Sequence, residues 1–165
     1  MPVPWPGRVR AARPGAWNAG EGYVVVTETI TGSGPTSEEP LVATIEVTET
    51  NFNDIADKGI VLLDFWAEWC GPCKMFGPIF EKASEKHEDI TFGKIDTDQE
   101  QALAQGFEIR SIPTLMAIRD GIVVFAQPGA IPALALGDLI RQVRALDMDE
   151  IRAELDKELK NAQKN

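Results

Sequence analysis

The two cysteines of the chain, Cys70 and Cys73, lie where an apolar, strand-like run at 60–66 gives way to a helix-like pattern. A helix that begins near Cys70 places this sulfur at its N-terminus, where unpaired backbone N–H groups and the helix dipole stabilise an anion. We therefore expect the pKa of the Cys70 thiol to fall below that of a free cysteine and Cys70 to act as a nucleophile. Cys73 lies on the same helical face, so it can attack a mixed disulfide on Cys70 as the resolving thiol.

The two residues between the cysteines suit this geometry. Pro72 fits the first turn of a helix, where a missing N–H costs nothing, and Gly71 permits a tight turn before it. A CxxC pair also serves as half of a structural zinc site, which needs four ligands. The chain has only one histidine, His87, too far along the helix to complete such a site. We expect no metal site within one chain; a zinc cluster shared between two subunits is the remaining alternative.

The segment around the cysteines, DFWAEWCGPCK at 64–74, resembles the active-site segment of the thioredoxin family almost letter for letter. Further matches to family features are Pro78 in the active-site helix, 94–96 at the end of a strand, 112–114 as the cis-proline loop and 129–130 as the last active-site loop. The resemblance covers about residues 42–146. It implies an α/β thioredoxin fold, with a mixed central sheet flanked by helices.

The apolar pattern alone is compatible with that architecture. It predicts strands at 43–47, 60–66, 90–95, 114–119 and 122–126, with Asp120 and Gly121 as a hairpin turn. Helices are predicted at 50–57 with a Thr or Asn cap, at 70–87 with a break at Pro78, at 98–106 and at 132–146. Helices that alternate with strands favour a mixed sheet covered on both faces.

Asp64 lies in the apolar run at 60–66, and we expect its carboxyl group to be buried and its pKa raised. The resemblance implies that Asp64 is the general base that takes the proton from Cys73, with Lys94 as a neighbouring charge. The alternative is a solvent-facing Asp64 at a strand edge.

The resemblance also implies that Pro113 is cis and that Ile112 offers its backbone to an extended substrate segment. Composition alone predicts a trans bond. The substrate-binding rim is then expected to consist of uncharged residues around Cys70: Trp69, Gly71, Pro72, Ile112, Pro113 and Gly129. Trp66 is expected either to support the site or to belong to the core.

These expectations together predict a protein disulfide reductase that binds no cofactor and relies on a redox-active Cys70–Cys73 disulfide. The resemblance implies thioredoxin reductase as electron donor and disulfide-containing proteins as substrates. One alternative is a thioredoxin-fold chaperone or a binding subunit of a larger assembly. A dithiol oxidase or isomerase is the other, although the Gly-Pro pair between the cysteines favours the reducing side.

Composition limits the possible partners and location. A formal net charge of -10 argues against nucleic acid or an anionic membrane as partner. No run of apolar residues is long enough to span a membrane. Sparse cysteines fit a reducing compartment, so we expect a cytoplasmic protein. We also expect the chain to be a monomer.

The ends of the chain extend beyond the predicted domain at 41–147. Residues 1–40 are rich in Pro, Gly, Thr and Ser, cannot build a core, and are predicted to be a disordered extension or a wrongly assigned start, with a targeting segment or a functional arm as alternatives. Residues 148–165 are predicted to form an amphipathic helix capped by Asp147, with an apolar stripe at Met148, Ile151, Leu155 and Leu159. The stripe is expected to dock on its own domain or to bind a partner.

Overall fold

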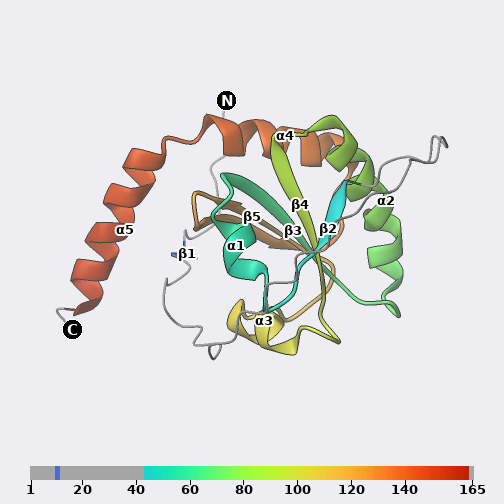
Figure 1. The fold of residues 1–165 in the computed structure, drawn as a ribbon. Helices are drawn as coiled ribbons and strands as arrows, with labels where there is room; N and C mark the ends of the chain where they lie inside the picture. The colour runs from blue at the N-terminus through green and yellow to red at the C-terminus, as the bar shows by residue number, and fades with distance from the viewer. Residues whose placement is uncertain (1–9, 12–42, 164–165) are drawn as a thin grey trace, which may run out of the picture.

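The computed structural model describes residues 10–11 and 43–163, which contain one six-stranded mixed sheet (Figure 1). The strand order is β1-β6-β5-β3-β4-β2. β3 pairs in parallel with β4 and antiparallel with β5, so the strand that precedes the cysteines lies in the middle of the sheet. The strands are β1 (Arg10–Ala11), β2 (Thr44–Glu46), β3 (Ile60–Trp66), β4 (Ile90–Asp96), β5 (Thr114–Arg119) and β6 (Ile122–Pro128).

Helices cover both faces of the sheet. Figure 1 shows α2 and α4 on one face and α1 and α3 on the other, while α5 extends from the end of α4 away from the sheet. The helices are α1 (Phe52–Ala56), α2 (Gly71–Lys86), α3 (Gln101–Gly106), α4 (Ala133–Ala145) and α5 (Met148–Gln163). The mixed, two-sided sheet that the sequence predicts is confirmed.

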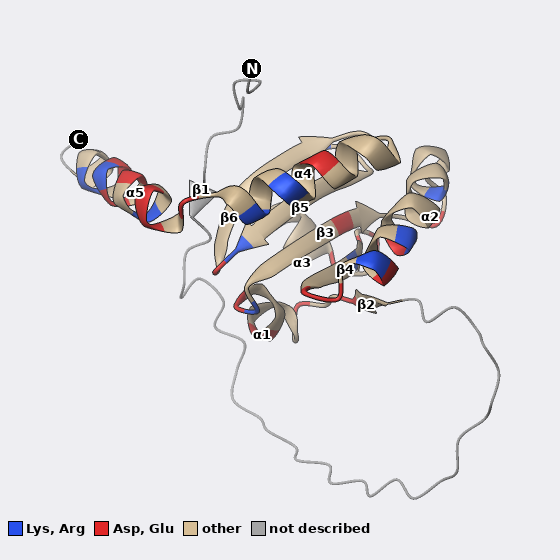
Figure 2. Ribbon diagram, turned by 90° about the horizontal axis from the view of Figure 1, so that it is seen from above, with Lys and Arg blue, Asp and Glu red and all other residues tan. Residues whose placement is uncertain are grey.

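The alternation of side chains along β3 divides the core into two layers. Leu62 belongs to the cluster under α2 and α4, whereas Leu63 and Phe65 belong to the cluster under α1 and α3. Because all three are fully buried, β3 is a central strand covered on both faces. Asp64 has the same parity as Leu62 and therefore points into the α2 and α4 layer. Charge is sparse on the central strands compared with α5 (Figure 2).

The hairpin between β5 and β6 turns at Asp120 and Gly121, as predicted. Both residues have positive φ, 52° and 77°, which is the conformation of a two-residue turn that matches the twist of the strands. β5 has the bounds that the sequence predicts, because a proline precedes it and this turn ends it.

Three predicted helix features differ from the structure. The break at Pro78 is wrong: α2 continues through it, because Pro78 removes one backbone donor without ending the helix. α1 begins after Asn51, but the Asn51 side chain accepts from the Thr48 N–H and donates to the Glu46 carbonyl instead of capping the helix. α3 begins at Gln101 rather than 98, because the Asp96 carboxylate accepts from the Asp98 N–H and holds a turn there.

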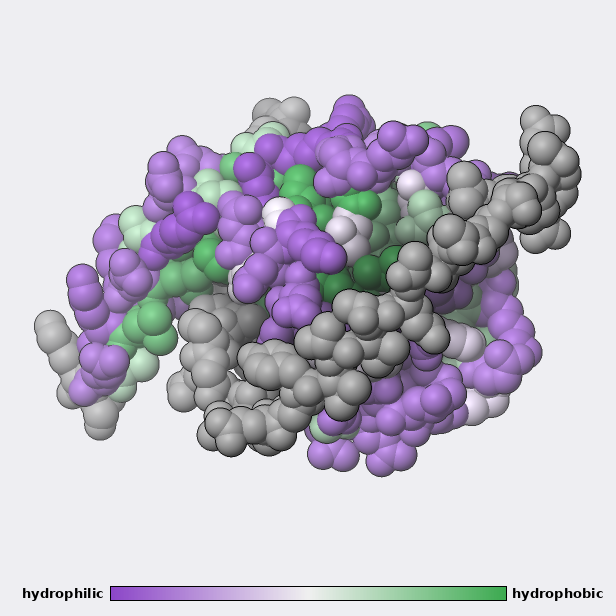
Figure 3. Space-filling view, in the orientation of Figure 1, coloured by the Kyte–Doolittle hydropathy of each residue, from purple (hydrophilic) through white to green (hydrophobic). Residues whose placement is uncertain are grey.

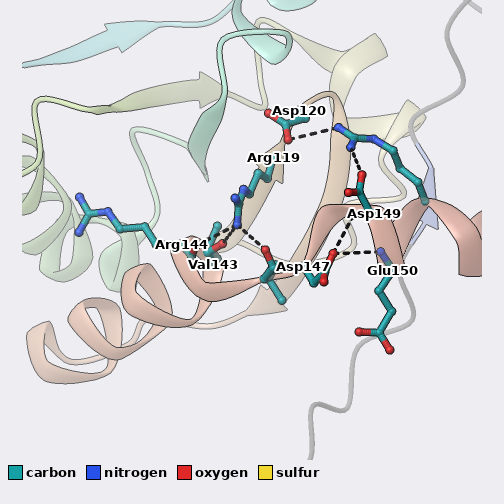
Figure 4. Close-up of polar contacts among 9 residues, drawn as sticks. Arg119, Asp120, Val143, Arg144, Asp147, Asp149 and Glu150 are labelled. Carbon is teal, nitrogen blue, oxygen red and sulfur yellow. Dashed lines mark hydrogen bonds and ion pairs between the residues drawn. The ribbon is translucent and has the colours of Figure 1, made fainter.

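The predicted C-terminal helix is present as α5, and Asp147 caps it. The Asp147 Oδ1 atom accepts from the N–H groups of Asp149 and Glu150 at 3.0 and 3.2 Å (Figure 4). Met148 is buried in the core cluster under α2 and α4, and Ile151 packs against that cluster. The start of the apolar stripe is therefore docked on its own domain.

The remainder of the stripe is less uniform. Leu155 is buried, whereas Leu159 is 48% exposed. Figure 3 shows hydrophobic side chains along α5 between hydrophilic ones.

The predictions for residues 1–40 fall outside the described residues, apart from Arg10 and Ala11. These two form β1, which pairs antiparallel with β6 opposite Val123 and Ile122. The sequence analysis predicts no strand at these two residues.

Candidate active site

Cys70 and Cys73 form a disulfide at the start of α2. Their Cα atoms are 5.3 Å apart, a separation that suits a disulfide. Both residues are only 4% exposed in this oxidised state, so burial does not distinguish them. Whatever distinguishes the two sulfurs must come from their surroundings.

The N-terminus of α2 provides such a difference. Cys70 is the N-cap residue, and its Sγ accepts a hydrogen bond from the Cys73 N–H at 3.2 Å. No acidic residue lies in the first turn of the helix, so nothing there competes for its positive end. A thiolate on Cys70 would face a backbone donor and the helix dipole, whereas Cys73 lies inside the first turn.

Asp64 is fully buried on the central strand β3, on the face of the sheet that α2 and α4 cover. Neither of its carboxylate oxygens has a hydrogen-bond partner. Burial raises the pKa of Asp64 from 3.8 to about 7; the charge of Lys94 opposes this shift and that of Glu81 adds to it. The alternative of a solvent-facing Asp64 is wrong. A carboxyl group that titrates near neutral pH can accept and return a proton there.

Lys94 lies next to Asp64 on the neighbouring strand, since the two residues are register partners of β3 and β4. Its Nζ atom is 3.2 Å from the Glu81 Oε1 atom and 5.0 Å from the centroid of the Trp66 ring. Trp66 is half-buried and also packs against the cluster of Ala67 and the two cysteines. Trp66 therefore contacts both the disulfide cluster and Lys94.

The loop before β5 brings Ile112 against the disulfide. The Ile112–Pro113 bond is cis, as the resemblance implies. The Ile112 carbonyl oxygen is 3.7 Å from Cys70 Sγ, and the side chain packs against the cysteine cluster. The Gly129 N–H donates to the Pro113 carbonyl at 2.7 Å, with Gly129 at a φ of 98° that favours glycine. The loops at 112–113 and 129 are thus joined directly.

The residues of the predicted rim differ in exposure. Trp69 is 70% exposed, yet its indole Nε1–H donates to the Asp98 carboxylate at 2.9 Å, which fixes the orientation of the ring. Gly71, Pro72 and Gly129 are exposed, Ile112 is half-buried, and Pro113 is buried. Pro113 therefore supports the rim from beneath.

Two residues near this site were not predicted from the sequence. Glu81 follows Cys73 by two intervals of four residues, so helical periodicity places both on one face of α2. That signal was available. Asp98, the partner of Trp69, carried no signal, because the contact joins two separate loops.

No metal site or membrane helix is found in what the structure describes. Within residues 10–11 and 43–163, no three His, Cys, Asp or Glu side chains come together as ligands for a metal ion. None of the helices in the same ranges is both long and apolar enough to cross a lipid bilayer.

Comparisons with known proteins agree with this geometry. The family model described as Thioredoxin matches residues 43–142. The chain is 57% identical over 113 residues to the "Putative thioredoxin 2" of Streptomyces coelicolor, a match that covers 68% of this chain and 84% of that protein. It is 39% identical over 102 residues to the thioredoxin of Bacillus subtilis, covering 61% of this chain and 98% of that one.

A solved structure shares the fold. A mutant thioredoxin from Halobacterium salinarum superimposes with a TM-score of 0.59 at 38% sequence identity, over 63% of this chain and 93% of the other. The family match spans β2 to most of α4 and includes both cysteines, Asp64 and the cis-proline loop. The chain therefore belongs to the thioredoxin family.

Proposed function

We propose that Cys70 and Cys73 make this chain a thioredoxin-type protein disulfide reductase. The observation that carries the proposal is the disulfide at the N-terminus of α2, where the Cys73 N–H donates to Cys70 Sγ. In the reduced protein, the same donor and the helix dipole would stabilise a thiolate on Cys70.

The reaction has two exchange steps. The Cys70 thiolate attacks a substrate disulfide, forms a mixed disulfide and releases one substrate thiolate. Cys73 then loses its proton, and its thiolate attacks the Cys70 sulfur of the mixed disulfide. The second substrate thiolate then leaves. The substrate disulfide has been reduced by two electrons, and Cys70 and Cys73 have been oxidised to a disulfide.

Asp64 is the proposed acceptor of the Cys73 proton. Its burial raises its pKa to about 7, which is close to the pH at which the proton must be taken up and later released. Because neither carboxylate oxygen has a hydrogen-bond partner, both remain available for that proton or for a water that carries it.

Ile112 and the surrounding rim are the proposed substrate-binding surface. The Ile112 carbonyl lies beside Cys70 Sγ, so an extended substrate segment bound to this backbone would bring its disulfide to the nucleophile. Exposed Trp69, Gly71, Pro72 and Gly129 offer uncharged surface around it, with Pro113 beneath. Such a surface would accept many disulfide proteins.

The wider setting is proposed from the family. The electron donor would be a thioredoxin reductase, the substrates disulfide-containing proteins, and the chain a monomer of the cytoplasm. The Cys70–Cys73 pair would be the only redox group that the reaction requires. We also propose the boundaries 41–147 for the domain and 148–165 for the added helix, since Asp147 caps α5 where α4 has ended.

Reduction of insulin by the full chain, with dithiothreitol as electron source, tests the proposal. Cys70→Ser is expected to abolish the reaction, and Cys73→Ser to stall it as a stable mixed disulfide through Cys70 that mass spectrometry detects. Lys82→Ser, an exposed change on the same helix, serves as the control and is expected to leave the rate unchanged.

The alternatives give different outcomes. A chaperone or binding subunit would retain its effect on client proteins in both cysteine variants and would not need turnover. An oxidase or isomerase would show an oxidising equilibrium potential for the Cys70–Cys73 pair in a glutathione buffer, whereas a reductase requires a reducing one.

A further inference from the structure

One face of α2 carries a row of three residues that leads to the ammonium group of Lys94, the neighbour of Asp64. Cys73, Gly77 and Glu81 follow one another at intervals of four, so they lie one above the other along the helix. Cys73 and Gly77 are buried, while the Glu81 side chain is 35% exposed. The row leads from the disulfide to the edge of the domain.

Lys94 lies across this row. Its Nζ atom contacts the Glu81 carboxylate at 3.2 Å and lies over the Trp66 ring at 5.0 Å. A Cβ atom placed on Gly77 would be 3.8 Å from the same Nζ, an ordinary van der Waals distance, so the ammonium group lies close to this turn of the helix. The contacts with Glu81 and Trp66 therefore define where this cation lies.

The ammonium group borders a pocket of about 420 Å³ at the edge of β2 and β4. Glu46 of β2, Glu81 of α2 and Asp96 of β4 line the pocket together with Lys94. Glu81 is the acid in hydrogen-bond contact with Lys94 and also the acid whose charge acts on Asp64.

Asp64 is the residue that this arrangement affects. Lys94 is its register partner on the neighbouring strand, yet neither Asp64 oxygen has a hydrogen-bond partner. If Lys94 paired with Asp64 instead, the carboxylate would be stabilised as an anion and would become a weaker base. What holds Lys94 elsewhere therefore controls how readily Asp64 takes a proton.

We propose that Glu81 is a positioning residue for the proton-transfer step, since its carboxylate holds the Lys94 ammonium at the pocket and away from Asp64. The inference rests on the proposed function, in which Asp64 accepts the proton of Cys73. Glu81 contacts neither cysteine and is not itself a catalytic residue.

Titration of Asp64 in the oxidised full chain tests this role, with the carboxyl carbon followed by NMR. Glu81→Gln removes the charge and keeps the shape. Both the loss of the Glu81 charge and the release of Lys94 toward Asp64 lower the pKa of Asp64, by about one unit in total. Glu85→Gln, an exposed change one turn further along α2, is the matched control and is expected to leave the Asp64 titration unchanged.

A conservative variant and the reaction itself sharpen the test. Glu81→Asp keeps the charge on a shorter side chain. The fall in the pKa of Asp64 is therefore expected to be at most half of that in Glu81→Gln. In insulin reduction, Glu81→Gln is expected to move the acid limb of the pH–rate profile to lower pH by the same amount as the titration. An unchanged or raised pKa of Asp64 in Glu81→Gln would overturn the inference. Lys94 would then not have approached Asp64 after the loss of the Glu81 charge.

The two possible failures are distinguishable. If the unmodified chain does not reduce insulin, the proposed function is wrong and the proton-transfer role fails with it. If the unmodified chain reduces insulin and Asp64 titrates alike in the Glu81→Gln and Glu85→Gln variants, only the role of Glu81 is wrong.

Discussion

Two helix ends in this protein differ in the group that faces them: a permanent charge at one and a sulfur at the other. At the C-terminus of α4, the Arg119 guanidinium donates to the carbonyl oxygens of Val143, Arg144 and Leu146 at 2.7, 3.0 and 2.9 Å (Figure 4). A permanent cation thus satisfies the negative end of that helix. At the N-terminus of α2, the residue that meets the positive end is Cys70, whose sulfur would gain and lose charge in the proposed reaction.

The surroundings of the two ends differ in the same sense. Next to the α4 end, Asp120 pairs with Arg152 at 3.4 Å, and Asp147 caps α5. On the face of the sheet that α2 covers, Asp64 is buried without a hydrogen-bond partner. Satisfied polar groups fix the junction between α4 and α5, whereas the chemistry proposed for the α2 end uses a carboxyl group without a hydrogen-bond partner. The comparison therefore distinguishes a structural site from a chemical one by its hydrogen bonds.

The largest expected effect concerns Asp64. Its folded-state pKa is about 7 against an ordinary value of 3.8, so the folded chain binds more protons between these values and stability falls as pH rises through that window. The loss between pH 4.5 and pH 8 is about 3 kcal/mol. Asp64→Asn is expected to lack this component, as urea unfolding of the oxidised protein at both pH values would measure.

The same experiment can contradict the comparison. If Asp64→Asn and the unmodified chain lose equal stability between the two pH values, Asp64 is not an unsatisfied carboxylate in the folded protein. The contrast between the two helix ends would then disappear.

Arg119 provides the next largest effect. Arg119→Met removes all three bonds to the α4 carbonyl oxygens and is expected to cost about 2 kcal/mol in urea unfolding, because bonds to a charged donor are the stronger class. Arg141→Met, on the exposed side of α4, is the matched control and is expected to cost under about 0.5 kcal/mol. Insulin reduction per folded molecule is expected to be unchanged in both variants.

A loss of insulin reduction in folded Arg119→Met protein would mean that the junction takes part in the chemistry. The division between a structural and a chemical end would then be wrong.

Asp147 is expected to show the smallest effect. Asp147→Ala removes the cap of α5 and is expected to cost about 1 kcal/mol. Hydrogen exchange would locate the loss of stability. Amides in the first turns of α5 are expected to exchange faster, whereas exchange near Cys70 is expected to be unchanged. Asp156→Ala, an exposed change in the middle of α5, is the control. Equal exchange in the two variants would show that the cap does not hold the helix.

Much of this fold follows from local sequence signals. β3 was predicted from its continuous apolar run, and β5 from the proline before it and the Asp120–Gly121 turn after it. The break at Pro78 was wrong because neighbouring turns and burial of Phe76 and Phe80 keep α2 together across one missing donor. The strand β1 could not be predicted, because it depends on the free edge of β6 rather than on its own sequence.

The candidate site was predictable to a similar degree. The position of Cys70 at a helix N-terminus and the burial of Asp64 followed from the apolar run and the helical pattern around them. The Glu81–Lys94 contact could not be predicted, because it depends on the register of β3 with β4 and on how α2 crosses both strands. The Trp69–Asp98 bond and the Arg119 contacts likewise join segments far apart in the chain.

The central claim is that the α2 N-terminus activates Cys70 and not Cys73, although both are equally buried. The most direct test is a brief pulse of iodoacetamide on the reduced full chain at pH 7, followed by peptide mass spectrometry. We expect Cys70 to be labelled at least about tenfold faster than Cys73, because only the thiolate reacts. Equal labelling, or faster labelling of Cys73, would contradict it.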